Sequence, residues 1–141
     1  MRYFGAYPAY RLIIDLRDNP GGDTQPFRTL LRGIISDNAI DQTGRIFGLV
    51  NQFTASSATL DADSLRALTR AILIGQPTMM SIDTYDNDAL LILSYYGIVI
   101  GYTTKLINPT GKPFALPAIT LVPALHQVLT GADPVLATAL G

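Results

Sequence analysis

The sequence of 141 residues has no cysteine and no glutamate, and His126 is its single histidine. Without cysteine the chain can form no disulfide, no zinc–thiolate site and no cysteine nucleophile. One histidine excludes a metal site built from several imidazole ligands. All eleven acidic residues are aspartates, so a mechanism that needs a glutamate has none to use. We expect no metal and no other cofactor.

Charge and long hydrophobic runs are also scarce. Charged residues make up 15% of the chain, and the formal net charge is −1. This balance cannot build the positive field that nucleic-acid binding requires, so we expect no nucleic-acid partner. The apolar run at residues 89–93 is far shorter than the roughly 20 residues of a membrane-spanning helix. We expect no membrane span, although a longer parent chain could carry a targeting segment and be secreted or associated with the cell envelope.

What the sequence does have is a hydrophobic fraction of 48%, which is typical of a globular domain. Its length predicts a single domain over residues 1–141. A buried-strand pattern begins as early as residue 11, so we expect this domain to be truncated if the parent chain is longer. Apolar surface exposed by truncation predicts association, either as a homo-oligomer or with a missing N-terminal region.

The first half of the chain alternates apolar runs with amphipathic segments. Residues 11–16, 46–50 and 71–74 are short apolar runs, typical of strands that are covered on both faces. Apolar side chains recur at helical spacing over residues 26–35, and a second helix is predicted from about residue 56 to 70. Short connections between alternating strands and helices predict parallel pairing, so the fold class is α/β.

The second half is richer in β-type residues. Residues 90–96 and 98–103 flank Gly97 and predict an antiparallel hairpin. We expect a final edge strand at residues 119–122 and a terminal helix with Asp133 as its N-cap.

Three aspartates, Asp83, Asp86 and Asp88, precede the predicted hairpin. They have part of the pattern of a calcium-binding loop but lack its other ligands and its spacing. We interpret them as a solvated loop, and residues 108–113 as a second, exposed loop.

Two loops follow successive predicted strands, at the sheet edge where parallel α/β folds bind ligands. The first contains Gly21 and Gly22, whose amides can turn toward an anion or oxyanion. The second places Ser56 and Ser57 at a strand-to-helix junction, where a hydroxyl is exposed and the next amide lies at the positive helix end. Taken singly, the loops are explained more simply by a plain turn and an ordinary helix cap.

Taken in order, the loops resemble the C-terminal processing (tail-specific) serine peptidase family. The segment LIIDLRDNPGG at residues 12–22 resembles the strand and turn of that family, and VNQFTASSA at residues 50–58 resembles the segment that holds its nucleophile. Residues 75–78 and 131–140 are similar to the family's next strand end and its closing helix. Residues 102–105 are similar to the branch that includes tricorn-type and retinoid-binding-protein-like members.

The resemblance implies a crotonase/Clp-protease-like β-α superhelix, here a partial catalytic domain with a following β-rich segment. It implies that Ser56 is the nucleophile, that Ser57 supplies one oxyanion amide, and that Gly21 or Gly22 supplies the other. The implied function is serine-type peptide hydrolysis, and the implied substrate is a peptide or protein.

The sequence departs from this family at the general base, without which a serine hydroxyl stays protonated and inert. The processing-protease branch has a lysine shortly after the turn at residues 75–78. This chain has Met79 and Met80 there, which we interpret as core or cleft lining. The tricorn-like branch uses an upstream histidine and a downstream glutamate, and this chain has neither. We therefore expect the isolated chain to hydrolyse little or no peptide.

Three other side chains could accept a proton. His126 is more simply explained as a surface or capping histidine, and Lys105 and Lys112 as solvated, protonated lysines. Two alternatives stay open. In the first alternative, the chain is a non-catalytic module that keeps the peptidase fold and binds a peptide or an apolar ligand. In the second, it is one piece of an enzyme whose missing region supplies the base and covers the aromatic residues at 3–10.

Overall fold

The computed structural model describes residues 11–107 and 115–141, apart from the side chains of residues 84–88 and 107. The predicted loop at residues 108–113, Lys112 and the aromatic residues at 3–10 lie outside this description. No helix in the described ranges is long and apolar enough to cross a membrane. The elements in chain order are β1 (Leu12–Asp15), α2 (Gln25–Ile35), β2 (Ile46–Val50), α3 (Ser57–Leu68), β3 (Ile72–Gly75), β4 (Thr84–Leu93), β5 (Ile98–Ile107), β6 (Ile119–Thr120), α4 (Leu125–Thr130) and α5 (Pro134–Leu140).

A parallel sheet forms the centre of the molecule. Its strand order is β1-β2-β3-β6, and all three neighbouring pairs are parallel. All five residues of β2 are buried, because sheet neighbours and helices cover the strand on every side. This burial explains why the strand is a continuous apolar run rather than an alternating one. The predicted α/β class with a parallel sheet is confirmed.

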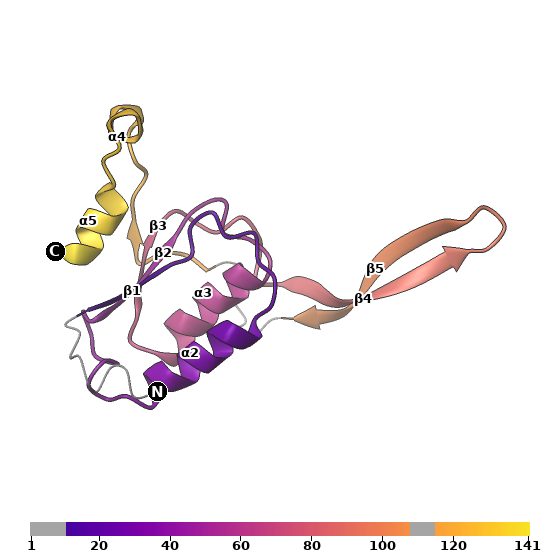
Figure 1. The fold of residues 1–141 in the computed structure, drawn as a ribbon, viewed down its shortest axis with the longest axis horizontal. Coiled ribbons are helices and arrows are strands. Elements are labelled where there is room, and N and C mark those ends of the chain that lie inside the picture. The colour runs from indigo at the N-terminus through magenta and orange to yellow at the C-terminus, as the bar shows by residue number, and fades with distance from the viewer. Residues whose placement is uncertain (1–10, 108–114) are drawn as a thin grey trace.

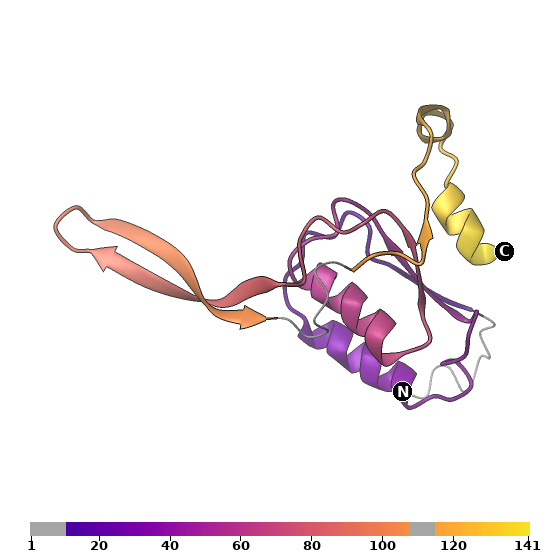
Figure 2. The same cartoon turned by 180° about the vertical axis from the view of Figure 1, so that it is seen from behind.

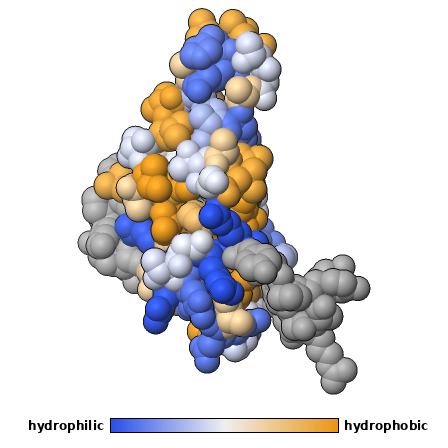
Figure 3. Space-filling view, turned by 90° about the vertical axis from the view of Figure 1, so that its left-hand side faces the viewer, coloured by the Kyte–Doolittle hydropathy of each residue, from blue (hydrophilic) through white to orange (hydrophobic). Residues whose placement is uncertain are grey.

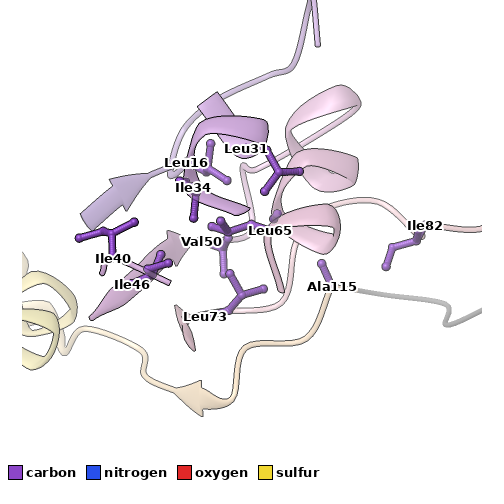
Figure 4. Close-up of a cluster of buried hydrophobic side chains, with 11 residues drawn as sticks. Leu16, Leu31, Ile34, Ile40, Ile46, Val50, Leu65, Leu73, Ile82 and Ala115 are labelled. Carbon is purple, nitrogen blue, oxygen red and sulfur yellow. The ribbon is translucent and has the colours of Figure 1, made fainter. Parts of the chain in front are cut away.

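Helices cover both faces of the sheet (Figures 1 and 2). On one face, α2 and α3 contribute Leu31, Ile34 and Leu65 to a core that includes Ile46, Val50 and Leu73 of the strands (Figure 4). On the other face, Val135 and Ala139 of α5 pack against Phe47, Leu49 and Ile74. The result is a three-layer arrangement that leaves the carboxyl ends of β1, β2 and β3 at one edge.

β4 and β5 form a separate two-stranded antiparallel sheet that projects away from the layers (Figure 1). The predicted hairpin is therefore confirmed, but its strands are longer than expected. The interpretation of Asp83, Asp86 and Asp88 as a solvated loop is wrong for the last two, because β4 begins at Thr84. These residues pair in register with β5, which extends to Ile107. Cross-strand pairing here overrides the low β propensity of aspartate.

The C-terminal segment returns to the sheet as the edge strand β6 and then forms α4 and α5. Asp133 caps α5, because its Oδ1 accepts a hydrogen bond from the Leu136 amide at 2.9 Å. The predicted edge strand and terminal helix are both confirmed. The sequence did not predict α4, a short helix that carries no buried residue and stands at the top of the space-filling view (Figure 3).

Candidate active site

The loops that follow β1 and β2 are bound to each other through Thr54, which is fully buried. Thr54 Oγ1 donates a hydrogen bond to the Leu16 carbonyl at 2.8 Å and accepts one from the Asn51 amide at 3.0 Å. One residue further on, the Ala55 amide donates to the Asn19 carbonyl at 2.9 Å. The backbone before Ser56 is thereby fixed against the backbone before the diglycine.

A second pair of contacts joins the same two loops. The Asp18 amide donates to Asn51 Oδ1 at 3.1 Å, and Asn51 Nδ2 donates to Asp18 Oδ1 at 3.0 Å. Asp18 has a positive φ of 55°, a conformation that aspartate tolerates better than most residues. The reciprocal contacts hold Asp18 in this turn, which directs the chain toward Gly21.

Gly21 lies directly against the serine turn. A Cβ atom on Gly21 would be 2.6 Å from Ser56 Cβ, 2.9 Å from the Ser57 nitrogen and 3.0 Å from the Ala55 carbonyl oxygen. Its φ of 100° is also a conformation that side chains rarely adopt. Only glycine allows the two loops to approach this closely. The structure therefore brings together the two loops that the sequence singled out.

Ser56 occupies a strained position at the start of α3. Its φ and ψ are 51° and −131°, which is the first central position of a type II′ turn and is normally taken by glycine. Such strain costs on the order of 1–3 kcal/mol and gathers at functional sites. The Ser56 side chain makes no capping hydrogen bond to α3, and the residue is exposed. The explanation of Ser56 as an ordinary helix cap is therefore wrong.

Some backbone amides around Ser56 already donate a hydrogen bond, and others do not. The Gly21 amide donates to Asn19 Oδ1 at 2.9 Å. Within the described part of the chain, the amides of Gly22 and Ser57 have no hydrogen-bond acceptor. Ser57 is the first residue of α3, where the helix dipole favours negative charge. Gly22 is thus the glycine whose amide remains available to a ligand.

Met80 touches Ser56 from the loop after β3. The Ser56 amide donates to the Met80 sulfur at 3.1 Å. The Met79 amide donates to the Thr54 carbonyl at 3.0 Å, and this contact folds the loop back onto the serine turn. Met80 thus lines the site, as the interpretation of the two methionines as core or cleft lining allows. Met79 is 55% exposed, so it is not part of the core.

No general base adjoins Ser56 in the described ranges, where no histidine, lysine or aspartate side chain hydrogen-bonds to it. His126 lies on α4 and Lys105 on β5, and both are exposed. A thioether is only a weak hydrogen-bond acceptor and does not take up a proton at neutral pH. The side chain beside the serine is therefore one that cannot activate it.

Arg17 fixes the α5 side of the same sheet edge. Its guanidinium pairs with Asp15 at 2.6 Å and with Asp133 at 2.8 Å. These hydrogen bonds raise the pKa of Arg17 above its usual value, and the bond from Arg17 holds the pKa of Asp133 below its usual value. A cavity of about 110 Å³ adjoins Arg17, Asn51 and other residues at the strand ends. Because its Nε and Nη2 donate to Asp15 and its Nη1 donates to Asp133, Arg17 acts as a structural link between β1 and α5.

Solved structures of proteases share this fold. A photosystem II C-terminal processing protease matches 85% of this chain and 36% of its own, with 19% identity and a TM-score of 0.64. A candidate peptidase from Parabacteroides merdae matches 94% of this chain and 51% of its own, with 15% identity and a TM-score of 0.72. The tricorn protease matches 93% of this chain and 14% of its own, with 21% identity and a TM-score of 0.64. The structural neighbours are thus the kinds of protease that the sequence resembles.

The comparisons also define how far the likeness extends. The chain spans about half or less of the length of these three proteins. No protein-family model matches the sequence, and no curated protein matches it. At identities of 15–21%, the similarity is one of fold.

Proposed function

We propose that the chain is a partial catalytic domain of a serine-type peptidase of the C-terminal processing family, with the crotonase-like β-α superhelix of that family. Ser56 is the nucleophile, and the amides of Gly22 and Ser57 form the oxyanion site. The observation that carries this proposal is the strained, uncapped Ser56 held against the diglycine turn. Plain loops have no need of such strain, whereas a nucleophile at a sharp strand-to-helix turn does.

The geometry supports acyl transfer to Ser56. Its oxygen attacks the carbonyl carbon of a peptide bond, and the carbonyl electron pair moves onto the oxygen, where the Gly22 and Ser57 amides stabilise the negative charge. Collapse of this intermediate breaks the C–N bond and leaves an acyl-serine that water hydrolyses. One such amide contributes about 10²–10³ in rate. The serine proton must pass through a base to the leaving amine.

The missing base makes the isolated chain a poor hydrolase. Met80 occupies the space beside Ser56, and its sulfur cannot take the proton. We expect a fluorophosphonate probe, followed by intact-mass measurement, to give no more adduct on the wild-type chain than on Ser56→Ala. Clear labelling that disappears in Ser56→Ala would show an activated hydroxyl and would contradict the expected inactivity.

Met80 also favours a second candidate, a non-catalytic module that binds an extended peptide or an apolar ligand with the same fold. In that case the open amides of Gly22 and Ser57 would bind a carbonyl or carboxylate without reaction. Peptide affinity that is unchanged by Ser56→Ala, together with absence of turnover after a base is restored, would support the module over the peptidase.

A further inference from the structure

The cavity beside Arg17, at the carboxyl edge of the sheet, takes no part in the acyl transfer proposed above. Its volume is about 110 Å³. Its apolar lining consists of Val50 at the end of β2, Leu121 and Pro123 after β6, and Val135 in α5. Val50 and Val135 belong to the two buried cores, one on each face of the sheet. The packed layers of the fold therefore hold the cavity in shape.

Most polar groups around the cavity are already engaged within the protein. Arg17 pairs with two aspartates, and Asp18 and Asn51 exchange hydrogen bonds with each other. Gln76 differs from them. Its backbone amide donates to the Val50 carbonyl at 3.0 Å, but within the described ranges its side-chain amide has no hydrogen-bond partner. The cavity thus combines an apolar lining with a free, uncharged polar group, as ligand pockets typically do.

The size of the cavity determines what it can hold. An apolar cavity of about 150 Å³ takes up benzene, so a cavity of about 110 Å³ suits a smaller group, such as the side chain of leucine. Pockets that hold a whole small molecule measure about 300–1,000 Å³. Burial of one leucine side chain strengthens binding about 10- to 100-fold, which gives selectivity but does not retain a free molecule. The occupant is therefore one part of a larger ligand that also binds nearby.

The nearest open binding groups belong to the candidate active site. Asp18 and Asn51 line the cavity, and the loops that contain them continue to Gly22 and Ser56. Gly22 lies four positions after Asp18, so at most about 14 Å separates the two residues, and an extended peptide covers that distance in about four residues. A peptide bound at the amides of Gly22 and Ser57 can therefore reach the cavity with a side chain.

We propose that the cavity is a subsite for one aliphatic side chain of a peptide whose backbone binds at the amides of Gly22 and Ser57. The proposal rests on the proposed function, because it assigns a selectivity to the peptide of that site. The free side chain of Gln76 binds the peptide backbone at the mouth of the cavity. An aromatic side chain is too large for the cavity, and a polar one loses its contacts with water against the apolar lining.

NMR titration of the isotope-labelled full chain with three peptides tests the proposal. The peptides are acetylated pentapeptide amides with four alanines around one central residue, which is leucine, asparagine or phenylalanine. Leucine and asparagine have nearly the same shape, so they differ mainly in polarity. The leucine peptide is expected to bind at least about tenfold more tightly than the asparagine peptide.

Variants of Leu121 change the volume of the cavity in both directions. Leu121→Trp fills it and is expected to reduce the preference for leucine over asparagine to less than about threefold. Leu121→Ala enlarges it and is expected to favour the phenylalanine peptide over the leucine peptide by at least about fivefold. Leu125→Ala is the matched control, because Leu125 is 75% exposed on α4 and does not line the cavity. This variant should keep the wild-type preference.

Equal binding of the leucine and asparagine peptides to the wild-type chain would overturn the proposal, as would an unchanged preference in folded Leu121→Trp. Absence of peptide binding would overturn both this proposal and the proposed function. Amide shifts separate the two otherwise. Leucine selectivity with shifts at Gln76 and Val135, but none at Gly22 and Ser57, would support the cavity and contradict the proposed function. Shifts at Gly22 and Ser57 without leucine selectivity would contradict the cavity alone.

Discussion

Gly21 lies so close to Ser56 that a Cβ atom on the glycine would be 2.6 Å from the Cβ atom of the serine. Thirty-five positions of sequence separate them, yet the two carboxyl strand ends of β1 and β2 bring them to one point of the sheet edge. This contact joins the turn that offers a free amide to the turn that presents a hydroxyl.

The contact predicts that Gly21→Ala is strongly destabilising. The added methyl group would meet backbone atoms of Ala55 and Ser57, which cannot move aside as a flexible side chain could. Because this clash adds to the unfavourable φ, we expect Gly21→Ala to lower the free energy of unfolding by about 3 kcal/mol or more, measured by urea titration. Gly22→Ala is the matched control.

Gly22 has a positive φ but no atom within 4 Å of the position where a Cβ atom would lie. We expect Gly22→Ala to cost about 1–2 kcal/mol, from backbone strain alone. Equal losses for the two variants would show that the close approach of Gly21 to the serine turn is not a feature of the protein in solution.

A second prediction concerns the strain at Ser56. Glycine adopts a φ of 51° and a ψ of −131° with little penalty, so Ser56→Gly should raise the free energy of unfolding by about 1 kcal/mol. Ser56→Ala keeps a Cβ atom and should give no such gain. The comparison separates relief of strain from loss of the hydroxyl, and a destabilised Ser56→Gly would contradict the strained geometry.

A third prediction concerns Asp61 of α3, which is buried. Burial raises the pKa of its carboxyl from 3.8 to about 6, and the nearby Arg28 opposes the shift. The folded chain then binds more protons than the unfolded chain between these two values. Stability contributed by Asp61 is therefore complete below about pH 4 and is lost as pH rises through about 6. We expect Asp61→Asn to flatten this decline and to gain about 1–2 kcal/mol at pH 7.

Thermal unfolding from about pH 2 to about pH 8 measures this effect, with Asp133→Asn as the control. The pKa of Asp133 is lowered, chiefly by the hydrogen bond from Arg17, so its contribution is present at neutral pH and is lost as pH falls. Asp61→Asn should thus remove a loss of stability that occurs as pH rises, and Asp133→Asn should remove a loss of stability that occurs as pH falls. A profile that is unchanged by Asp61→Asn would show that this carboxyl titrates at its ordinary pKa.

Sequence reasoning found the sheet and the two loops because their signals are local. A continuous apolar run marks a strand that is buried on both faces, and the diglycine and serine turns follow such runs directly. Sequence reasoning also predicted the Asp133 cap, because Asp133 followed by Pro134 is a typical helix start. These features depend on neighbours within a few positions.

Features that depend on distant contacts were missed. Met80 reaches Ser56 only because the loop after β3 folds back onto Thr54, and the one signal in the sequence was its place just after the turn at residues 75–78. The strand at Thr84 depends on pairing with β5. Sequence reasoning left open whether Gly21 or Gly22 supplies the oxyanion amide. The structure favours Gly22, because the Gly21 amide already donates a hydrogen bond to the Asn19 side chain.

The position of Met80 gives the most direct test of the central claim, that Ser56 and its amides form a catalytic site that lacks only a base. Lysine follows the path of methionine and extends one atom further, so Met80→Lys brings an amine to the side of Ser56 on which the Met80 sulfur now lies. Met79→Lys, at an exposed neighbouring position, is the matched control.

The measurement is the rate of fluorophosphonate acylation as a function of pH, for the wild-type chain, both lysine variants and the Met80→Lys/Ser56→Ala double variant. We predict that Met80→Lys reacts at least about 100-fold faster than the wild-type chain and Met79→Lys, that its rate rises with pH as the amine loses its proton, and that the double variant does not react. A folded Met80→Lys that reacts no faster than Met79→Lys, or a reaction that survives in the double variant, would contradict the claim.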